Sequence, residues 1–109
     1  MGLTKTDLYN EQDLEMAAIA KALAHPARIA IIRCLLASKQ CITGDLTEQI
    51  GLAQPTVSQH LKELKAIDII QGTITGTAVN YCINPSRWKQ IADLWALLFS
   101  QFPRENNCC

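Results

Sequence analysis

The sequence lacks an excess of charge of either sign, and it is poor in aromatic residues. Its 109 residues carry ten lysines and arginines against ten aspartates and glutamates, and only 6% of them are aromatic. This balance excludes a protein held to nucleic acid by bulk positive charge, although a local basic face is compatible with DNA binding. The apolar share of 49% excludes a disordered chain, and the length fits a single domain.

Long apolar runs and a cysteine framework are also missing. The apolar stretches are too short to span a bilayer, and the polar residues 1–12 do not resemble a signal peptide. The five cysteines are odd in number and have no regular spacing, which is a poor basis for a disulfide scaffold. We therefore expect a protein of the reducing cytoplasm with no membrane partner.

Catalytic signatures are absent as well. The sequence contains no HExxH, GxSxG, P-loop or Rossmann glycine pattern. Its two histidines, His25 and His60, stand in unrelated places, so a catalytic triad is hard to assemble. These absences argue against an enzyme.

The residues that are present predict a mostly helical chain with one β-hairpin. Apolar periodicity, prolines at helix starts and capping residues divide the chain into elements. Helices are expected at 11–24, 26–37, 44–51, 55–67 and 85–101, and hairpin strands at 67–71 and 77–83 around a turn at 72–76. Residues 1–10 are expected to form a flexible arm, 11–102 the folded domain and 103–109 a flexible tail that contains cysteines.

A short helix, a tight turn and a helix with a polar outer face form a helix-turn-helix, and a hairpin directly after it makes a wing. In the helix at 55–67, Val57, Leu61 and Leu64 make one apolar stripe. Short polar side chains near the start of such a helix suit base edges in the major groove, and a lysine further along suits a phosphate. The predicted DNA-contacting residues are Gln54, Thr56, Ser58, Gln59 and Lys62.

At this point the sequence resembles a known family. The segments HPARIAIIRCLL and GDLTEQIGLAQPTVSQHLKELKAIDII, with a hairpin ending in NYCINP, are similar to the ArsR/SmtB family of bacterial winged-helix repressors. The similarity covers roughly Leu14 to Leu98. It implies a winged helix-turn-helix of five helices and a two-stranded wing that dimerises through its first and last helices. It also implies a repressor that leaves inverted-repeat operator DNA when an effector arrives.

The wing departs from the pattern of that family, whose wings often carry basic residues. Residues 71–84 contain no lysine or arginine. Thr73 and Thr75 remain as candidates for hydrogen bonds to phosphates. We therefore expect a shallow dependence of DNA affinity on salt.

The last predicted helix concentrates the bulky aromatic residues of the chain. Apolar residues recur at helical spacing over nearly four turns, which exceeds what one small core needs. The predicted homodimer interface consists of Trp88, Ile91, Trp95, Leu98, Phe99 and Phe102.

The effector is the least determined part of the interpretation. The last helix has no histidine and one acid, Asp93, so it lacks the ligands of a zinc site. The family's Cys-x-Cys pair is replaced by Ile42 and Gly44. The adjacent thiols Cys108 and Cys109 suit a soft ion such as trivalent arsenic or antimony. The third thiolate is left open among Cys34, Cys41 and Cys82.

Three alternatives remain open at this stage. The same thiols are compatible with a redox-responsive or persulfide-responsive repressor. A repressor without any effector is the second alternative, and no cofactor is required in either case. The third belongs to a different class, a winged helix that binds proteins instead of DNA; the wing without basic residues favours it and the polar helix face argues against it.

Overall fold

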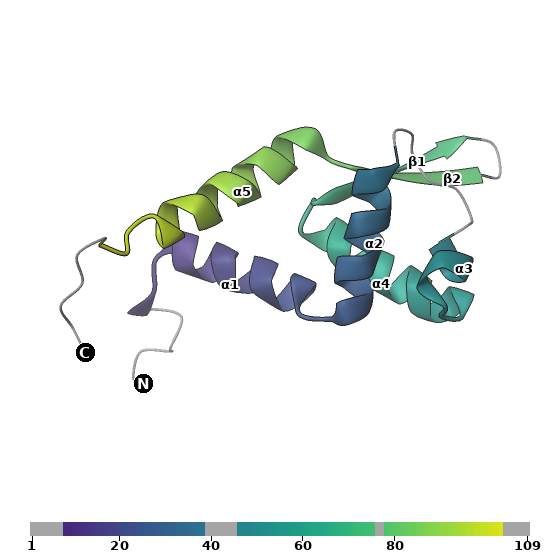
Figure 1. Ribbon diagram of the computed structural model, residues 1–109, viewed down its shortest axis with the longest axis horizontal. Coiled ribbons are helices and arrows are strands. Elements are labelled where there is room, and N and C mark those ends of the chain that lie inside the picture. The colour runs from purple at the N-terminus through teal and green to yellow at the C-terminus, as the bar shows by residue number, and fades with distance from the viewer. Residues whose placement is uncertain (1–7, 39–45, 76–77, 104–109) are drawn as a thin grey trace.

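The computed structural model describes residues 8–38, 46–75 and 78–103. These residues form five helices and one antiparallel hairpin, arranged as a winged helix-turn-helix (Figure 1). The predicted fold class is therefore confirmed for a single copy of the chain. The elements are α1 (Glu11–Leu23), α2 (Pro26–Ala37), α3 (Leu46–Ile50), α4 (Gln54–Ala66), β1 (Ile70–Thr75), β2 (Ala78–Ile83) and α5 (Pro85–Phe99).

Side-chain caps fix where three of the helices begin. The Oδ1 atom of Asn10 accepts a hydrogen bond from the backbone N–H of Asp13 at 2.7 Å, and Asn84 does the same for Arg87 at 3.4 Å. The Nδ1 atom of His25 accepts from the N–H of Ala27 at 3.1 Å. Each cap satisfies a donor that the first turn of a helix leaves without an intrahelical partner.

Some predicted boundaries were wrong, above all in the hairpin. β1 begins at Ile70 instead of residue 67, because Ile67 caps α4 and Asp68 turns the chain with a positive φ of 63°. β1 also extends to Thr75, further toward the turn than predicted, so that Gly72 lies inside the strand, opposite Tyr81. α4 begins at Gln54, and α5 ends at Phe99 rather than at residue 101.

The core lies where α1, α2, α4 and the start of the hairpin meet. The apolar stripe of α4 faces this core as predicted, and α2 crosses in front of α4 in Figure 1. The other side of α4 is left open to solvent. The fully buried side chains are Ile19, Ile31, Val57, Leu64, Ile69 and Ile70.

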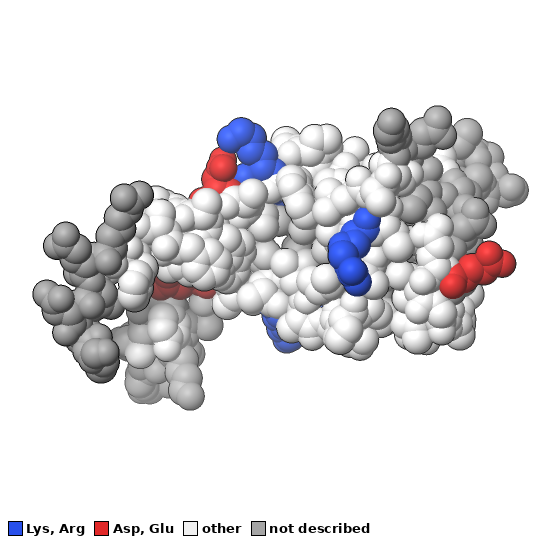
Figure 2. All heavy atoms as spheres, viewed as in Figure 1, with Lys and Arg blue, Asp and Glu red and all other residues white. Residues whose placement is uncertain are grey.

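Helices α1 and α5 lie side by side and project away from the hairpin (Figure 1). On the face seen in Figure 2, charged side chains are few and do not form a patch of one sign, and uncharged surface extends over both helices. None of the helices in the described part of the chain is long and apolar enough to cross a membrane.

Candidate nucleic-acid interface

The polar face of α4 is exposed along its length. Two hydrogen bonds run along it at i,i+4 spacing, from Gln54 to the Ser58 hydroxyl at 3.3 Å and from Gln59 to the Glu63 carboxylate at 3.2 Å. Both bonds are exposed, so the amides are free to exchange them for base edges. The structure brings all five predicted residues of α4 together on accessible surface: Gln54, Thr56, Ser58, Gln59 and Lys62.

The buried side of α4 is held by a polar contact with the start of α2. Arg28 donates from Nε to Nδ1 of His60 at 3.0 Å and from Nη1 to the carbonyl oxygen of Ala22 at 3.0 Å. Arg28 forms no ion pair with an acid among the described residues. His60 is only 7% exposed, so it is a buried packing residue of α4.

The protonation state of His60 follows from this contact. A guanidinium is always a donor, so the Nδ1 atom that accepts its bond carries no proton. Burial lowers the pKa of His60 below its ordinary value of 6.5, and the nearby His25 and Arg28 lower it further. The ring centroids of the two histidines are 4.4 Å apart. Helix α4 is thus docked through a neutral imidazole.

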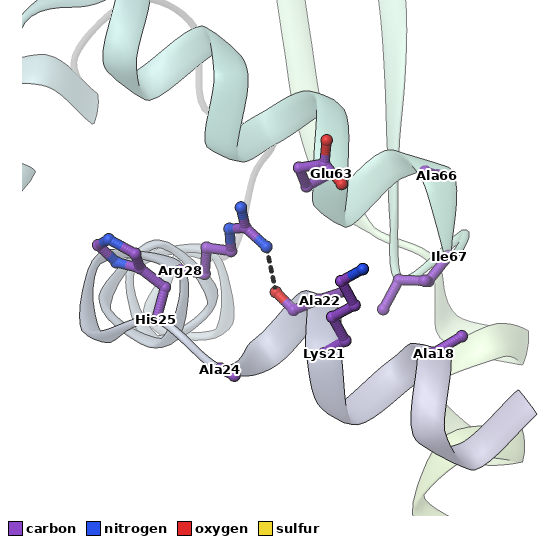
Figure 3. Close-up of a pocket in the computed structure, with 9 residues that line it drawn as sticks. All are labelled: Ala18, Lys21, Ala22, Ala24, His25, Arg28, Glu63, Ala66 and Ile67. Atoms are coloured by element: carbon purple, nitrogen blue, oxygen red, sulfur yellow. Dashed lines mark hydrogen bonds between the residues drawn. The ribbon is translucent and has the colours of Figure 1, made fainter.

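A cavity of about 590 Å³ lies beside this contact, between the end of α1, the start of α2 and the second half of α4 (Figure 3). In Figure 3, Arg28 points between Ala22 and α4, while Lys21 and Glu63 face the same space from α1 and α4. The cavity therefore carries charge of both signs on the flank of α4.

The wing is placed directly after α4 by the paired strands β1 and β2. The side chains of Thr73 and Thr75, which the sequence predicts to contact phosphates, lie outside the described residues. Gly72 packs closely here: a Cβ at this position would lie 3.1 Å from Cε1 of Tyr81, so the ring would have to shift by a few tenths of an ångström. The wing thus stacks an aromatic ring over its own backbone.

The predicted dimer residues on α5 divide into two groups. Ile91 is buried in the core of its own chain, and Trp88 and Trp95 pack partly against that core. Phe99 and Phe102 are 72% and 71% exposed, and Leu98 is also exposed. Leu8, Tyr9 and Leu14 add exposed apolar surface near the start of α1. The last turns of α5 and the N-terminal part of α1 therefore present the apolar surface that a second copy would cover.

The cysteines are only partly placed. Cys34 is a free thiol packed against the core, and Cys82 on β2 is disulfide-bonded. The predicted ligands Cys108 and Cys109, and Cys41, lie outside the described residues. Within the described ranges, no group of three or more His, Cys, Asp or Glu residues is close enough to hold a metal ion. Because a disulfide sulfur is not a thiolate, Cys82 in this state does not fit the role of third ligand.

Sequence reasoning missed one residue that orients α5. Arg87 donates from Nε to the carbonyl oxygen of Ile67 at 2.9 Å and forms an ion pair with Glu15 at 2.7 Å. It thereby joins α5 to α1 and to the end of α4. No sequence pattern indicates this role, because the partners lie 20 and 72 residues away along the chain.

Comparisons with known proteins agree with this geometry. The family model described as "Bacterial regulatory protein, arsR family" matches residues 25–71. The transcriptional repressor SmtB of Mycobacterium tuberculosis is 43% identical over 63 residues, which are 58% of this chain and 46% of SmtB. The chain thus aligns with just under half the length of that relative.

Two further similarities extend over more of the chain. The biofilm growth-associated repressor of Xylella fastidiosa is 28% identical over 97 residues, covering 89% of this chain and 83% of the repressor. The crystal structure of the repressor BigR from Xylella fastidiosa superposes with a TM-score of 0.63 at 25% identity, covering 94% of this chain and all of that one. These relatives are transcriptional regulators by name, not enzymes.

Proposed function

We propose, from its similarity to the ArsR/SmtB family of winged-helix regulators, that this chain is a homodimeric repressor that binds inverted-repeat operator DNA. In this proposal α4 enters the major groove, and the apolar ends of α1 and α5 form the contact between two copies. A two-fold dimer then presents its two recognition helices to half-sites about 34 Å apart.

The observation that carries the proposal is the exposed polar face of α4. It is presented by a helix whose opposite side is fixed to the core and to Arg28. Amides such as those of Gln54 and Gln59 form paired hydrogen bonds with adenine, and hydroxyls such as that of Ser58 bind either bases or phosphates. A protein-interaction surface of the same size would be expected to bear exposed apolar anchors, and α4 bears none on this face.

Two substitutions on α4 test the DNA contact. Gln59→Ala removes a predicted base contact, so discrimination between operator and altered operator should fall by about 1–3 kcal/mol. Lys62→Ala removes a predicted phosphate contact, so it should weaken binding to all sequences alike and reduce the salt slope by about one. Fluorescence anisotropy with labelled duplexes over a salt series measures both effects.

Lys89→Ala provides a matched control, because Lys89 is an exposed lysine on α5 whose only described partner is Asp93. It should leave operator binding unchanged. Unchanged affinity in a Gln54→Ala/Gln59→Ala double variant would contradict a DNA contact by α4, and absence of any binding to duplex DNA would favour the protein-interaction module.

For the effector, we propose a thiophilic metalloid, trivalent arsenic or antimony, taken up by Cys108, Cys109 and a third thiolate. The support is chemical. Thiolates are soft ligands, and once one of two adjacent thiolates has bound the metalloid, the second binds it at a low entropic cost. Of the two described cysteines, only Cys34 carries a free thiol. No cofactor is required for DNA binding in this proposal.

A variant that ends after Asn107 tests the role of the terminal pair. It should stay bound to operator DNA at arsenite concentrations that release the full chain, as measured by gel shift. Release of both forms at the same concentration would contradict the assignment. The disulfide of Cys82 favours a second candidate, a thiol redox response; release by polysulfide but not by arsenite would identify it.

A further inference from the structure

One arginine of α5 contacts three separate parts of the fold. The Nε atom of Arg87 donates to the backbone carbonyl oxygen of Ile67 at 2.9 Å, and its Nη1 atom donates to the Glu15 carboxylate at 2.7 Å. The same Nη1 atom donates to the side-chain oxygen of Gln90, one turn along α5, at 2.7 Å. The Arg87 side chain is only 16% exposed. Its guanidinium is thus turned to the inside of the fold rather than offered to a phosphate.

The contact with Ile67 holds the end of α4. Ile67 is the C-cap of that helix, and the chain turns directly after it through Asp68, whose φ is 63°. The last carbonyl groups of a helix lack intrahelical partners and carry partial negative charge, which a guanidinium stabilises. Because the acceptor is a backbone atom, the bond holds the main chain itself at the point where α4 leads into the wing.

The contact with Glu15 holds α1 to the same point. A hydrogen bond between ionised groups is shorter and stronger than one between neutral groups. The donors of a guanidinium lie in one rigid plane, so the bonds from Nε and Nη1 also define the direction between their two acceptors. Burial of apolar side chains is non-directional by comparison. Arg87 therefore holds α1, α5 and the end of α4 at a defined angle to one another.

These three helices join the two surfaces that the proposed function uses. Helix α4 presents the polar face, while the far ends of α1 and α5 carry exposed apolar side chains such as Leu14 and Phe99 (Figure 1). Within the described ranges, no other side-chain hydrogen bond joins α5 to α4 or to its C-cap. A rotation of α5 against α4 must therefore stretch or break the bonds of Arg87.

We infer that Arg87 is a positioning residue for operator recognition, which sets the angle and distance between the two copies of α4 in a dimer. It thereby determines which spacing of half-sites the dimer reads. This inference rests on the proposed function, because it requires a dimer joined through α1 and α5. One base pair moves a half-site by about 3.4 Å along the duplex and by about 35° around it. A loosened joint between α5 and α4 lets the dimer adapt to spacings that the intact dimer rejects.

Duplexes of varied spacing test this inference. The wild-type chain first selects its preferred inverted repeat from a random duplex library. Fluorescence anisotropy then compares that duplex with versions in which one or two base pairs are inserted or removed at the centre. The intact chain should bind the selected spacing most tightly, and a duplex with a single half-site measures the contact of one α4 alone.

Arg87→Met keeps an apolar side chain of similar reach but removes every donor. The ratio of its affinities for the selected and the altered spacings should fall about ten-fold, which is the factor that one charge-assisted hydrogen bond supplies. Its affinity for the single half-site should stay at the wild-type value, because the polar face of α4 is unchanged. A substitution that only weakened the fold would lower both affinities together.

Glu15→Ala is a second variant that acts through the same joint. It removes the link to α1 and leaves the bond from Arg87 to Ile67 in place. The Glu15 side chain is 38% exposed, so the folded chain tolerates its loss. This variant should also lower the spacing ratio without changing the affinity for the single half-site.

Two control variants leave the joint intact. Lys89→Met removes an exposed cation of α5 whose partner, Asp93, lies on the same helix. Ile91→Val trims a buried side chain of α5 and lowers stability without touching the bonds of Arg87. Both variants should keep the wild-type preference for the selected spacing.

Two outcomes would overturn the inference. The first is a wild-type spacing ratio in folded Arg87→Met, or in Glu15→Ala if the arginine variant does not fold. The second is an equal loss of affinity for the single half-site and the full operator, which would assign Arg87 to the fold alone. Failure of the proposed function gives a different result, because the wild-type chain then selects no duplex at all.

Discussion

At the scale of single residues, the contact between Arg28 and His60 governs how the recognition helix is held. The guanidinium needs an acceptor, and the Nδ1 atom of neutral His60 supplies it at 3.0 Å. A protonated imidazole has no acceptor left and would place a second positive charge beside Arg28. The docking of α4 therefore depends on a proton equilibrium inside the domain.

A fall in stability at mildly acidic pH is the expected consequence. The pKa of His60 is lowered in the folded state, so the unfolded chain binds more protons below about pH 6.5. Stability that is fully present above pH 6.5 is then lost as the pH falls toward the folded-state pKa. Urea denaturation between about pH 7.5 and pH 5.5 should show this slope. It should flatten in His60→Asn, which keeps an acceptor for Arg28 but does not titrate; equal slopes in both proteins would contradict the assignment.

At the scale of elements, the wing is shaped by one cross-strand pair. Tyr81 lies over the backbone of Gly72, and its ring also packs against the core. The pairing register of β1 and β2 therefore places the Tyr81 ring over a residue, Gly72, that has no side chain. The absence of lysine and arginine from residues 71–84 means that the wing holds its shape by packing and contributes little charge.

Gly72→Ala should destabilise the domain by about 1 kcal/mol, at the lower end of the cost of inserting a methyl group into a packed site. The reason is the 3.1 Å distance between the added Cβ and Cε1 of Tyr81. Thermal unfolding of Gly72→Ala, Tyr81→Ser and the double variant measures the coupling. If the stability losses of the two single variants add up in the double variant, contact with the Tyr81 ring is not the cause of the Gly72→Ala effect.

The lack of basic residues in the wing also predicts how salt affects DNA binding. With no cation on the wing, neutralisation of phosphates is left to side chains such as Lys62, so the slope of log affinity against log salt should be shallow. Replacing Asn80, a wing residue, with lysine should steepen the slope by about one for each protomer that contacts a phosphate. A steep slope in the unmodified protein would mean that cations outside the wing and α4 contact DNA.

At the scale of the whole molecule, α1 and α5 leave apolar surface open at the end distant from the wing (Figure 1). Phe99 stacks on Trp95 with ring centroids 5.9 Å apart, yet it remains 72% exposed. A small domain gains more from covering such surface with a second copy than from enlarging its own core.

Phe99→Glu should therefore give a folded monomer. The substituted side chain is open to solvent in a single copy, so the fold is retained, but a carboxylate in an apolar seam without a partner costs several kcal/mol. Sedimentation velocity at micromolar concentration, together with circular dichroism, measures both properties, and Phe99→Leu serves as the conservative control. A wild-type chain that sediments as a monomer would refute the dimer.

Local signals in the sequence are enough to predict the order of the elements and the polar face of α4. Prolines and capping residues mark helix starts locally, and the spacing of Val57, Leu61 and Leu64 is enough to say which side of α4 is buried. The start of β1 was misplaced because β-branched residues at 67–70 favour a strand, whereas the positive φ of Asp68 holds a turn there. Local propensity does not contain that constraint.

Which residues meet across long stretches of the chain depends on the tertiary structure. Arg28 and His60 are 32 residues apart, and Arg87 and Glu15 are 72 apart, so neither pair leaves a periodic signal in the sequence. The division of the α5 stripe into core and exposed parts likewise depends on the angle at which α5 crosses the domain. That angle is set by packing and by Arg87, because helical spacing specifies a face of a helix but not what lies opposite it.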